Sequence, residues 1–115
     1  PGWAGPTLTT TEWDYHPPGG EQYQTPNHVK RDDVLKEFDK NVAEAVKQIA
    51  ATSDDEFGKT WALKYQGNTM FTMPRTAVIR SFVLNHLIHH RAILCVYLRL
   101  NDVPVPGMYG PSGDE

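Results

Sequence analysis

The first regular pattern of apolar and polar positions lies between residues 31 and 52. Apolar residues recur there at spacings of one, three and four, which defines one face of a helix, and Lys and Glu occupy most of the other positions. Asp32 and Asp33 in the first turn suit the positive end of the helix dipole. The pattern predicts a long amphipathic helix over about residues 31–52, and Ser53 begins a fresh helix cap after it. The apolar positions are Val34, Leu35, Phe38, Val42, Val46 and Ile49.

The second long pattern runs over about residues 74–101 and is apolar nearly all round. Pro74 suits a first helical position, and the two prolines within residues 103–106 end the helix. At about 100° per residue, apolar side chains lie both on the face of His86 and on the opposite face. Such a helix must be buried on both sides. The face of His86 holds Ile79, Phe82, Val83, His90, Ile93, Leu94 and Tyr97, and the opposite face holds Leu84, Ile88, Cys95 and Leu98.

The remaining segments show little regular pattern. Residues 59–72 alternate weakly around Gly67 and Asn68, so we expect an extended connection there, with a rudimentary hairpin as the alternative. Gly and Pro concentrate at both ends of the chain, which predicts largely irregular ends. Two long helices cannot enclose a core, because bundles need about four. Another segment or a second chain must therefore cover the apolar faces.

Composition narrows the class of protein. The 115 residues make at most one domain, and 39% apolar with 22% charged residues is typical of a globular chain. The net charge of −3 argues against a general nucleic-acid binder. No apolar run approaches the roughly 20 residues that a membrane span needs, and no signal peptide opens the chain, so we expect a cytoplasmic protein without a membrane partner. The single cysteine, Cys95, excludes an intrachain disulfide, and its position favours a small hydrophobe.

Three histidines lie in the middle of the second helix. His86 and His90 are four residues apart, so their rings lie about one turn apart on one face and can point at one ion. Neutral imidazole is a common ligand of Zn, Ni, Cu and Fe(II). His89 is an alternative ligand or a group that orients one. The other interpretation is a set of core or interface histidines hydrogen-bonded to neighbours, or a solvated patch.

Several motifs together resemble the DinB/YfiT-like helical-bundle proteins. They are Asn-His-Leu-Ile-His-His-Arg at 85–91, Val-Tyr-Leu-Arg-Leu at 96–100 and the Pro- and Gly-rich segment 103–112. The first three residues, Pro-Gly-Trp, resemble the turn after the second helix of that family. The resemblance implies an all-α four-helix bundle that holds one divalent metal ion with three histidines, two of them His86 and His90. It also implies frequent dimers, and characterised relatives include thiol-dependent transferases and isomerases.

The chain departs from the family pattern at two places. The third histidine of the family precedes the Pro-Gly-Trp turn, at which this chain begins. We therefore expect a single domain over residues 1–115, truncated at its amino terminus and completed by a second chain. The missing ligand would come from water, from His89 or from that chain. Ala92 and Ile93 stand where the family usually has Gly-Gln, which makes a polar neighbour of the site apolar.

Two functions remain open at this point. The first is a divalent-metal-binding protein, with Zn or Ni favoured, that acts on a small-molecule or thiol substrate as a transferase or hydrolase; the ion would lower the pKa of a bound water or thiol. The second is a metal-free, non-catalytic oligomer, a vestigial fragment of the family. In either case we expect a homodimer formed through the long helix at Leu84, Ile88 and Leu98, because apolar burial is the main stabilising term available.

Overall fold

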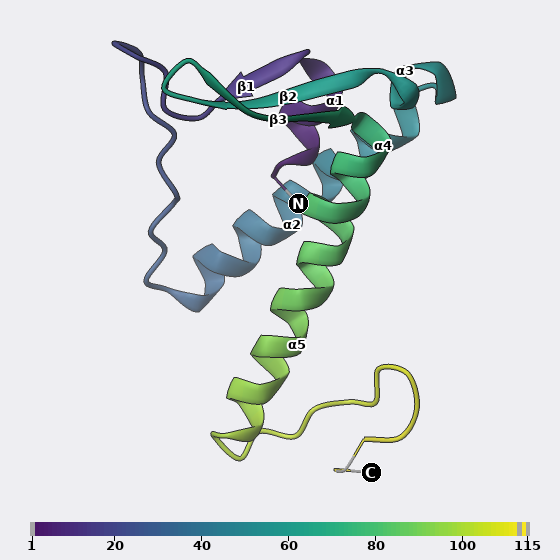
Figure 1. The fold of residues 1–115 in the computed structure, drawn as a ribbon. Coiled ribbons are helices and arrows are strands. Elements are labelled where there is room, and N and C mark those ends of the chain that lie inside the picture. The colour runs from purple at the N-terminus through teal and green to yellow at the C-terminus, as the bar shows by residue number, and fades with distance from the viewer. Residues whose placement is uncertain (1, 113, 115) are drawn as a thin grey trace.

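Two helical rods, the first over residues 31–51 and the second over residues 75–99, diverge beneath a small sheet (Figure 1). The computed structural model describes residues 2–112 and 114, so Pro1 of the expected Pro-Gly-Trp turn lies outside the described residues. About half of the described residues are helical. The elements are α1 (Ala4–Thr9), β1 (Glu12–Asp14), α2 (Arg31–Ala51), α3 (Asp54–Gly58), β2 (Thr60–Tyr65), β3 (Asn68–Pro74), α4 (Arg75–Val78), the π-helical η1 (Ile79–Asn85) and α5 (His86–Arg99).

The expected all-α fold is wrong, because the described residues contain a three-stranded mixed sheet in the order β1-β2-β3. Strand β1 pairs parallel to β2, and β2 pairs antiparallel to β3. Trp61 and Leu63 alternate with more exposed neighbours along β2, so a weak two-residue period is enough to bury one face of the sheet. The fold is therefore α+β, and the described residues do not form the expected four-helix bundle.

The hairpin between β2 and β3 corrects the expectation of an extended connection. Gln66 and Gly67 form the two-residue turn with φ of 50° and 78°, and two positive φ values in succession match the turn that suits the twist of a hairpin. A bulge after Leu63 leaves Met70 without a partner in the ladder. The rudimentary hairpin, which was the alternative, is thus the correct prediction for this segment.

The core lies at the top of the rods, where they meet the sheet. One cluster joins α1 to α2 and η1, and it includes Leu8, Ala45 and Val83. A second cluster joins the sheet to α4 through Trp61, Leu63 and Val78. Trp3 packs against both clusters. The short helix α1, which the sequence pattern did not indicate, is therefore the element that links the two halves of the core.

The second rod begins one residue later than its pattern indicated, since Pro74 ends β3 and the helix starts at Arg75. It continues without a break through η1 into α5. A π-helix has more residues per turn than an α-helix. A uniform rotation of 100° per residue therefore gives the wrong relative directions for side chains before and after residues 79–85.

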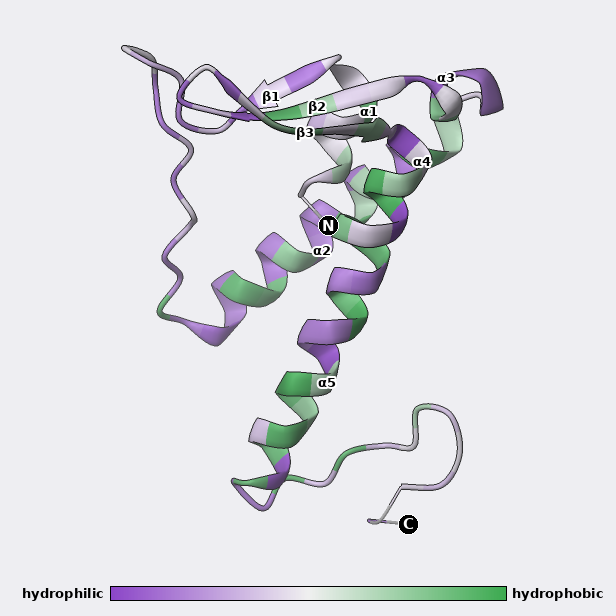
Figure 2. Ribbon diagram, in the orientation of Figure 1, coloured by the Kyte–Doolittle hydropathy of each residue, from purple (hydrophilic) through white to green (hydrophobic). Residues whose placement is uncertain are grey.

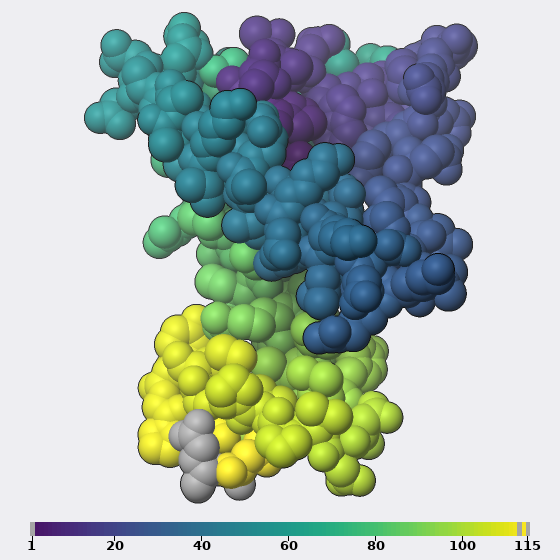
Figure 3. All heavy atoms as spheres, turned by 180° about the vertical axis from the view of Figure 1, so that it is seen from behind, coloured from purple at the N-terminus to yellow at the C-terminus, as the bar shows by residue number. Residues whose placement is uncertain are grey.

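Helix α5 leaves the core and extends away from it. None of its residues is buried, and apolar and polar bands alternate along it in Figure 2. Seen from behind, α2 lies over the upper part of the molecule and the carboxy-terminal residues gather at the lower end (Figure 3). Within one chain, helix α5 is therefore not covered on both sides. None of the described helices is both long and apolar enough to cross a membrane.

Candidate functional site

The histidine pair lies at the start of α5, directly after η1, with His86 as the first residue of the helix and His90 as the fifth. The Nε2 atoms of His86 and His90 approach to 2.8 Å, and their ring centroids are 4.6 Å apart. The ring of His89 lies 5.1 Å from that of His90 and 6.3 Å from that of His86. All three histidines are solvent-exposed. The i,i+4 spacing therefore brings the Nε2 atoms of His86 and His90 next to each other, and the ring of His89 lies beside them.

An aromatic wall borders this point on its inner side. Trp3, Phe82, Val83 and Leu87 line a hollow of about 180 Å³ together with the histidine pair. Phe82 stacks on Trp3 with a centroid distance of 5.5 Å and an interplanar angle of 13°. The same ring stacks on Phe71 of β3 at 5.0 Å and 10°. The sheet thus fixes Phe82, and Phe82 with Trp3 forms a rigid apolar side of the hollow.

The described residues supply two nitrogens at this point and no larger ligand set. Among residues 2–112 and 114, no three His, Cys, Asp or Glu side chains converge as a metal cage. No Asp or Glu is among the described residues that line the hollow. The arrangement can share a proton between the two rings or present two neutral nitrogens to one ion.

The residues expected to mediate association lie on the same rod. The side chains of Leu84 and Ile88 are exposed, with residue exposures of 42% and 46%, and Leu98 is half-buried. The sequence pattern therefore located apolar residues that this chain leaves uncovered.

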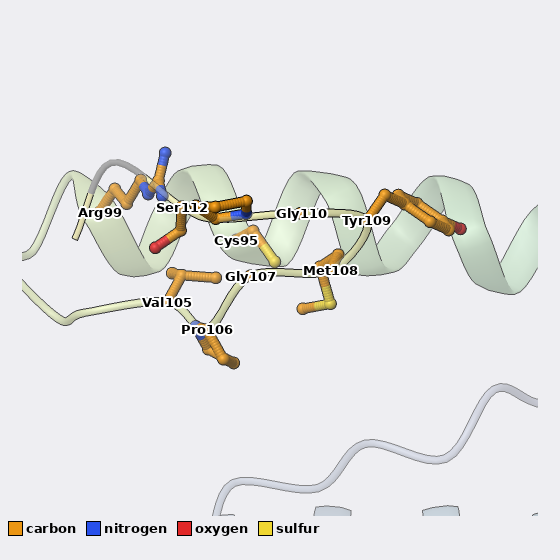
Figure 4. Close-up of a pocket in the computed structure, with 10 residues that line it drawn as sticks. Cys95, Arg99, Val105, Pro106, Gly107, Met108, Tyr109, Gly110 and Ser112 are labelled. Carbon is orange, nitrogen blue, oxygen red and sulfur yellow. The ribbon is translucent and has the colours of Figure 1, made fainter. Parts of the chain in front are cut away.

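Cys95 lies under the returning carboxy-terminal tail (Figure 4). Residues 105–112 pass over it and, with Cys95 and Arg99, line an open hollow of about 350 Å³. Arg91 donates to the Tyr109 hydroxyl at 2.8 Å, and Arg99 pairs with Asp114 at 2.9 Å. The backbone N–H of Val105 and the Arg99 cation hold the pKa of the Asp114 carboxyl below its usual value. These contacts hold the tail against α5. The sequence pattern predicted only an irregular end and did not predict them.

A further cavity, which no sequence pattern indicated, lies between α1, β1 and α2. It has a volume of about 580 Å³, and Trp3, Trp13, Tyr23 and Phe38 are among the residues that line it. Trp3 borders both this cavity and the hollow of the histidine pair. The clustering of aromatic residues near the amino terminus was the available signal, but only the fold brings these residues together.

A model of the DinB family matches residues 8–115 of the chain. No curated protein and no solved structure gives a significant match. The matched range includes the histidine pair, the sheet and the tail.

Proposed function

The chain belongs to the DinB family, as its motifs indicated, and on this premise we propose that it binds one divalent metal ion, Zn²⁺ or Ni²⁺, through His86 and His90. The observation that supports this most is the 2.8 Å approach of the two Nε2 atoms. Two nitrogens bound to one ion at about 2.0–2.1 Å lie about 2.9 Å apart at a right angle and about 3.4 Å apart at the tetrahedral angle. The two rings therefore need only a small rotation to fit the ion.

The remaining ligand positions would be filled by water, by His89 or by a group of a second chain. An open position is what a catalytic metal centre requires. When bound, the ion would lower the pKa of a water or thiol, which suits a transferase or hydrolase acting on a thiol or another small molecule. Trp3 and Phe82 would exclude water from the inner side of the site.

Replacing both histidines is expected to abolish specific metal binding. We expect wild-type protein to bind about one Zn²⁺ or Ni²⁺ per chain in native mass spectrometry and in competition with a chromogenic chelator. The double variant His86→Ala/His90→Ala removes both proposed nitrogens, so its affinity is expected to fall by about 100-fold or more.

His16→Ala is the matched control, because His16 lies outside the hollow of the histidine pair and contacts Tyr65. This variant should bind the ion as the wild type does. An unchanged affinity in the double variant would show that the metal is held elsewhere and would overturn the proposal. His89→Ala then tests the next ligand: a partial loss would assign His89 to the ion.

A second candidate function, self-association of a non-catalytic protein, is supported by the uncovered helix α5. Helix α5 buries none of its residues in the chain, and Leu84 and Ile88 expose large apolar side chains. Pairing two rods in a symmetric dimer would remove these side chains from water, at roughly 25 cal/mol for each Å² of apolar surface.

Introducing charge on that face is expected to dissociate the dimer. In Leu84→Glu/Ile88→Glu, two carboxylates would be buried without partners, which should raise the dimer dissociation constant by about 100-fold or more. Light scattering after size exclusion measures the mass. Val29→Glu is the control, because Val29 is an apolar residue with 91% exposure outside the rod. A monomeric wild type at micromolar concentration, or a charged variant that stays dimeric, contradicts this interface.

A further inference from the structure

The cavity between α1, β1 and α2 has the size of a ligand site and is partly open to solvent, since Tyr23 and Phe38 in its lining are exposed. Its volume of about 580 Å³ falls in the range of roughly 300–1,000 Å³ that small-molecule sites occupy. Trp3 lies beside α1, Trp13 lies on β1, and Phe38 lies on α2, so three separate parts of the fold line it. A segment of the connection between β1 and α2, which includes Tyr23, closes another side.

The ring of Trp13 stands at nearly a right angle to each of two neighbouring rings. Trp13 meets Trp3 edge to face, with centroids 5.6 Å apart and an interplanar angle of 86°. It meets Tyr23 in the same way at 5.4 Å and 84°. The backbone N–H of Tyr23 donates to the carbonyl of Tyr15 at 2.9 Å, which holds Tyr23 next to β1. Aromatic faces carry partial negative charge, so the ring faces that these contacts leave open to the cavity attract a cation.

A carboxylate adds a full negative charge to the same cavity. Glu37 is the one Asp or Glu among the described residues that line it. No Lys or Arg among them does so, and His28 is the one histidine. Glu37 accepts a hydrogen bond from Asn41 at 3.0 Å. Its Lys partner, Lys40, is 3.9 Å away and has a side chain that is 76% exposed. Such a long, solvated pair is weak, so the charge of Glu37 is available to a ligand.

From this combination we infer that the cavity binds an organic cation, of the substituted ammonium class, with its charge between the rings and Glu37 and its apolar part against Phe38. The ligand class follows from the chemistry of the walls: rings and one anion favour a bulky, weakly hydrated cation over an anion or a neutral sugar. The inference does not depend on the proposed metal site, although Trp3 places the two side by side.

Choline and its neutral isostere 3,3-dimethylbutan-1-ol provide the test, because they have the same shape and differ in charge. We expect choline to bind about ten-fold more tightly than the alcohol. Binding would be followed by NMR through the indole N–H resonances of Trp3 and Trp13. Equal affinities would identify a purely apolar cavity, and an absence of shifts with choline would show that no such site exists; either result overturns the inference.

Variants of Glu37 and Trp13 test whether choline binds in this cavity. Glu37→Gln keeps the shape of the side chain and removes the charge, so it is expected to weaken choline binding by about five-fold or more and leave the alcohol unaffected. Glu44→Gln, the same change on α2 outside the cavity, should have no effect. Trp13→Leu should weaken choline binding as well. The same titration on His86→Ala/His90→Ala should match the wild type, which separates failure of this inference from failure of the metal proposal.

Discussion

Replacing Trp61 with alanine is expected to lower the free energy of unfolding by about 3–5 kcal/mol. Trp61 is 1% exposed and belongs to the cluster that joins the sheet to α4. Its indole N–H donates to the carbonyl of Pro6 at 3.1 Å, which also fastens β2 to α1. The loss is a large share of the roughly 5–15 kcal/mol that stabilises a small domain. Urea unfolding followed by circular dichroism measures it.

Two further variants show which part of the effect is packing. Trp61→Phe keeps most of the ring volume and loses the hydrogen bond to Pro6, so it should cost about 1–2 kcal/mol. Tyr65→Ala truncates an aromatic residue at the exposed end of the same strand and should cost less than Trp61→Ala. A loss below about 1 kcal/mol for Trp61→Ala would mean that the sheet does not pack on α4 as described.

The second large effect is expected for Arg75→Ala, at about 3 kcal/mol. Arg75 is 6% exposed at the start of α4. Its guanidinium pairs with Glu56 at 2.7 Å and donates to the carbonyl of Thr10 at 2.9 Å, so it joins α3 and the segment after α1 to α4. Alanine removes both bonds and the buried stem. Lys59→Ala is the control, because Lys59 pairs with the same carboxylate from an exposed position and its loss should matter far less.

The stabilisation from the Arg75–Glu56 ion pair depends on pH because the Glu56 carboxylate titrates. The hydrogen bond from Lys59 and the charges of Lys59 and Arg75 hold the pKa of Glu56 below its ordinary value of 4.5. Since the folded pKa is the lower one, the stabilisation is fully present above about pH 4.5 and is lost as the pH falls through the folded value. The difference between the urea midpoints of wild type and Arg75→Ala should therefore narrow in that range, while the part due to the Thr10 hydrogen bond and the buried stem remains. A constant difference down to pH 3 would assign the effect to the buried stem and the Thr10 hydrogen bond and not to the ion pair with Glu56.

Local patterns predicted the parts of the structure whose cause is local. The periodicity of residues 31–52 corresponds to α2 at Arg31–Ala51. Ser53 caps α3, with its Oγ accepting from the backbone N–H of Glu56 at 3.3 Å. The i,i+4 spacing of His86 and His90 is enough to bring their rings together, because an α-helix places such residues on one face.

The fold class could not be obtained in this way. Strand β1 has three residues, too few for a recognisable alternation, and it exists because it pairs with residues 62–64 from a distant part of the chain. The hairpin depends on Gln66 in a conformation that non-glycine residues seldom adopt. The two helical periods alone predict an all-α protein, and this class is wrong because the pairing of distant strands leaves no local pattern in the sequence.

The sequence by itself determined the family, the two long helical segments and the spacing of the histidine pair, since motifs and helical periods are set by neighbours along the chain. Only the tertiary structure decided that a sheet covers the top of the rods and that Trp3 reaches the histidine pair. It alone also brought Trp13, Tyr23 and Glu37 into the lining of one cavity. These arrangements join residues from separate segments, so they follow from how the whole chain buries its apolar surface and pairs its backbone.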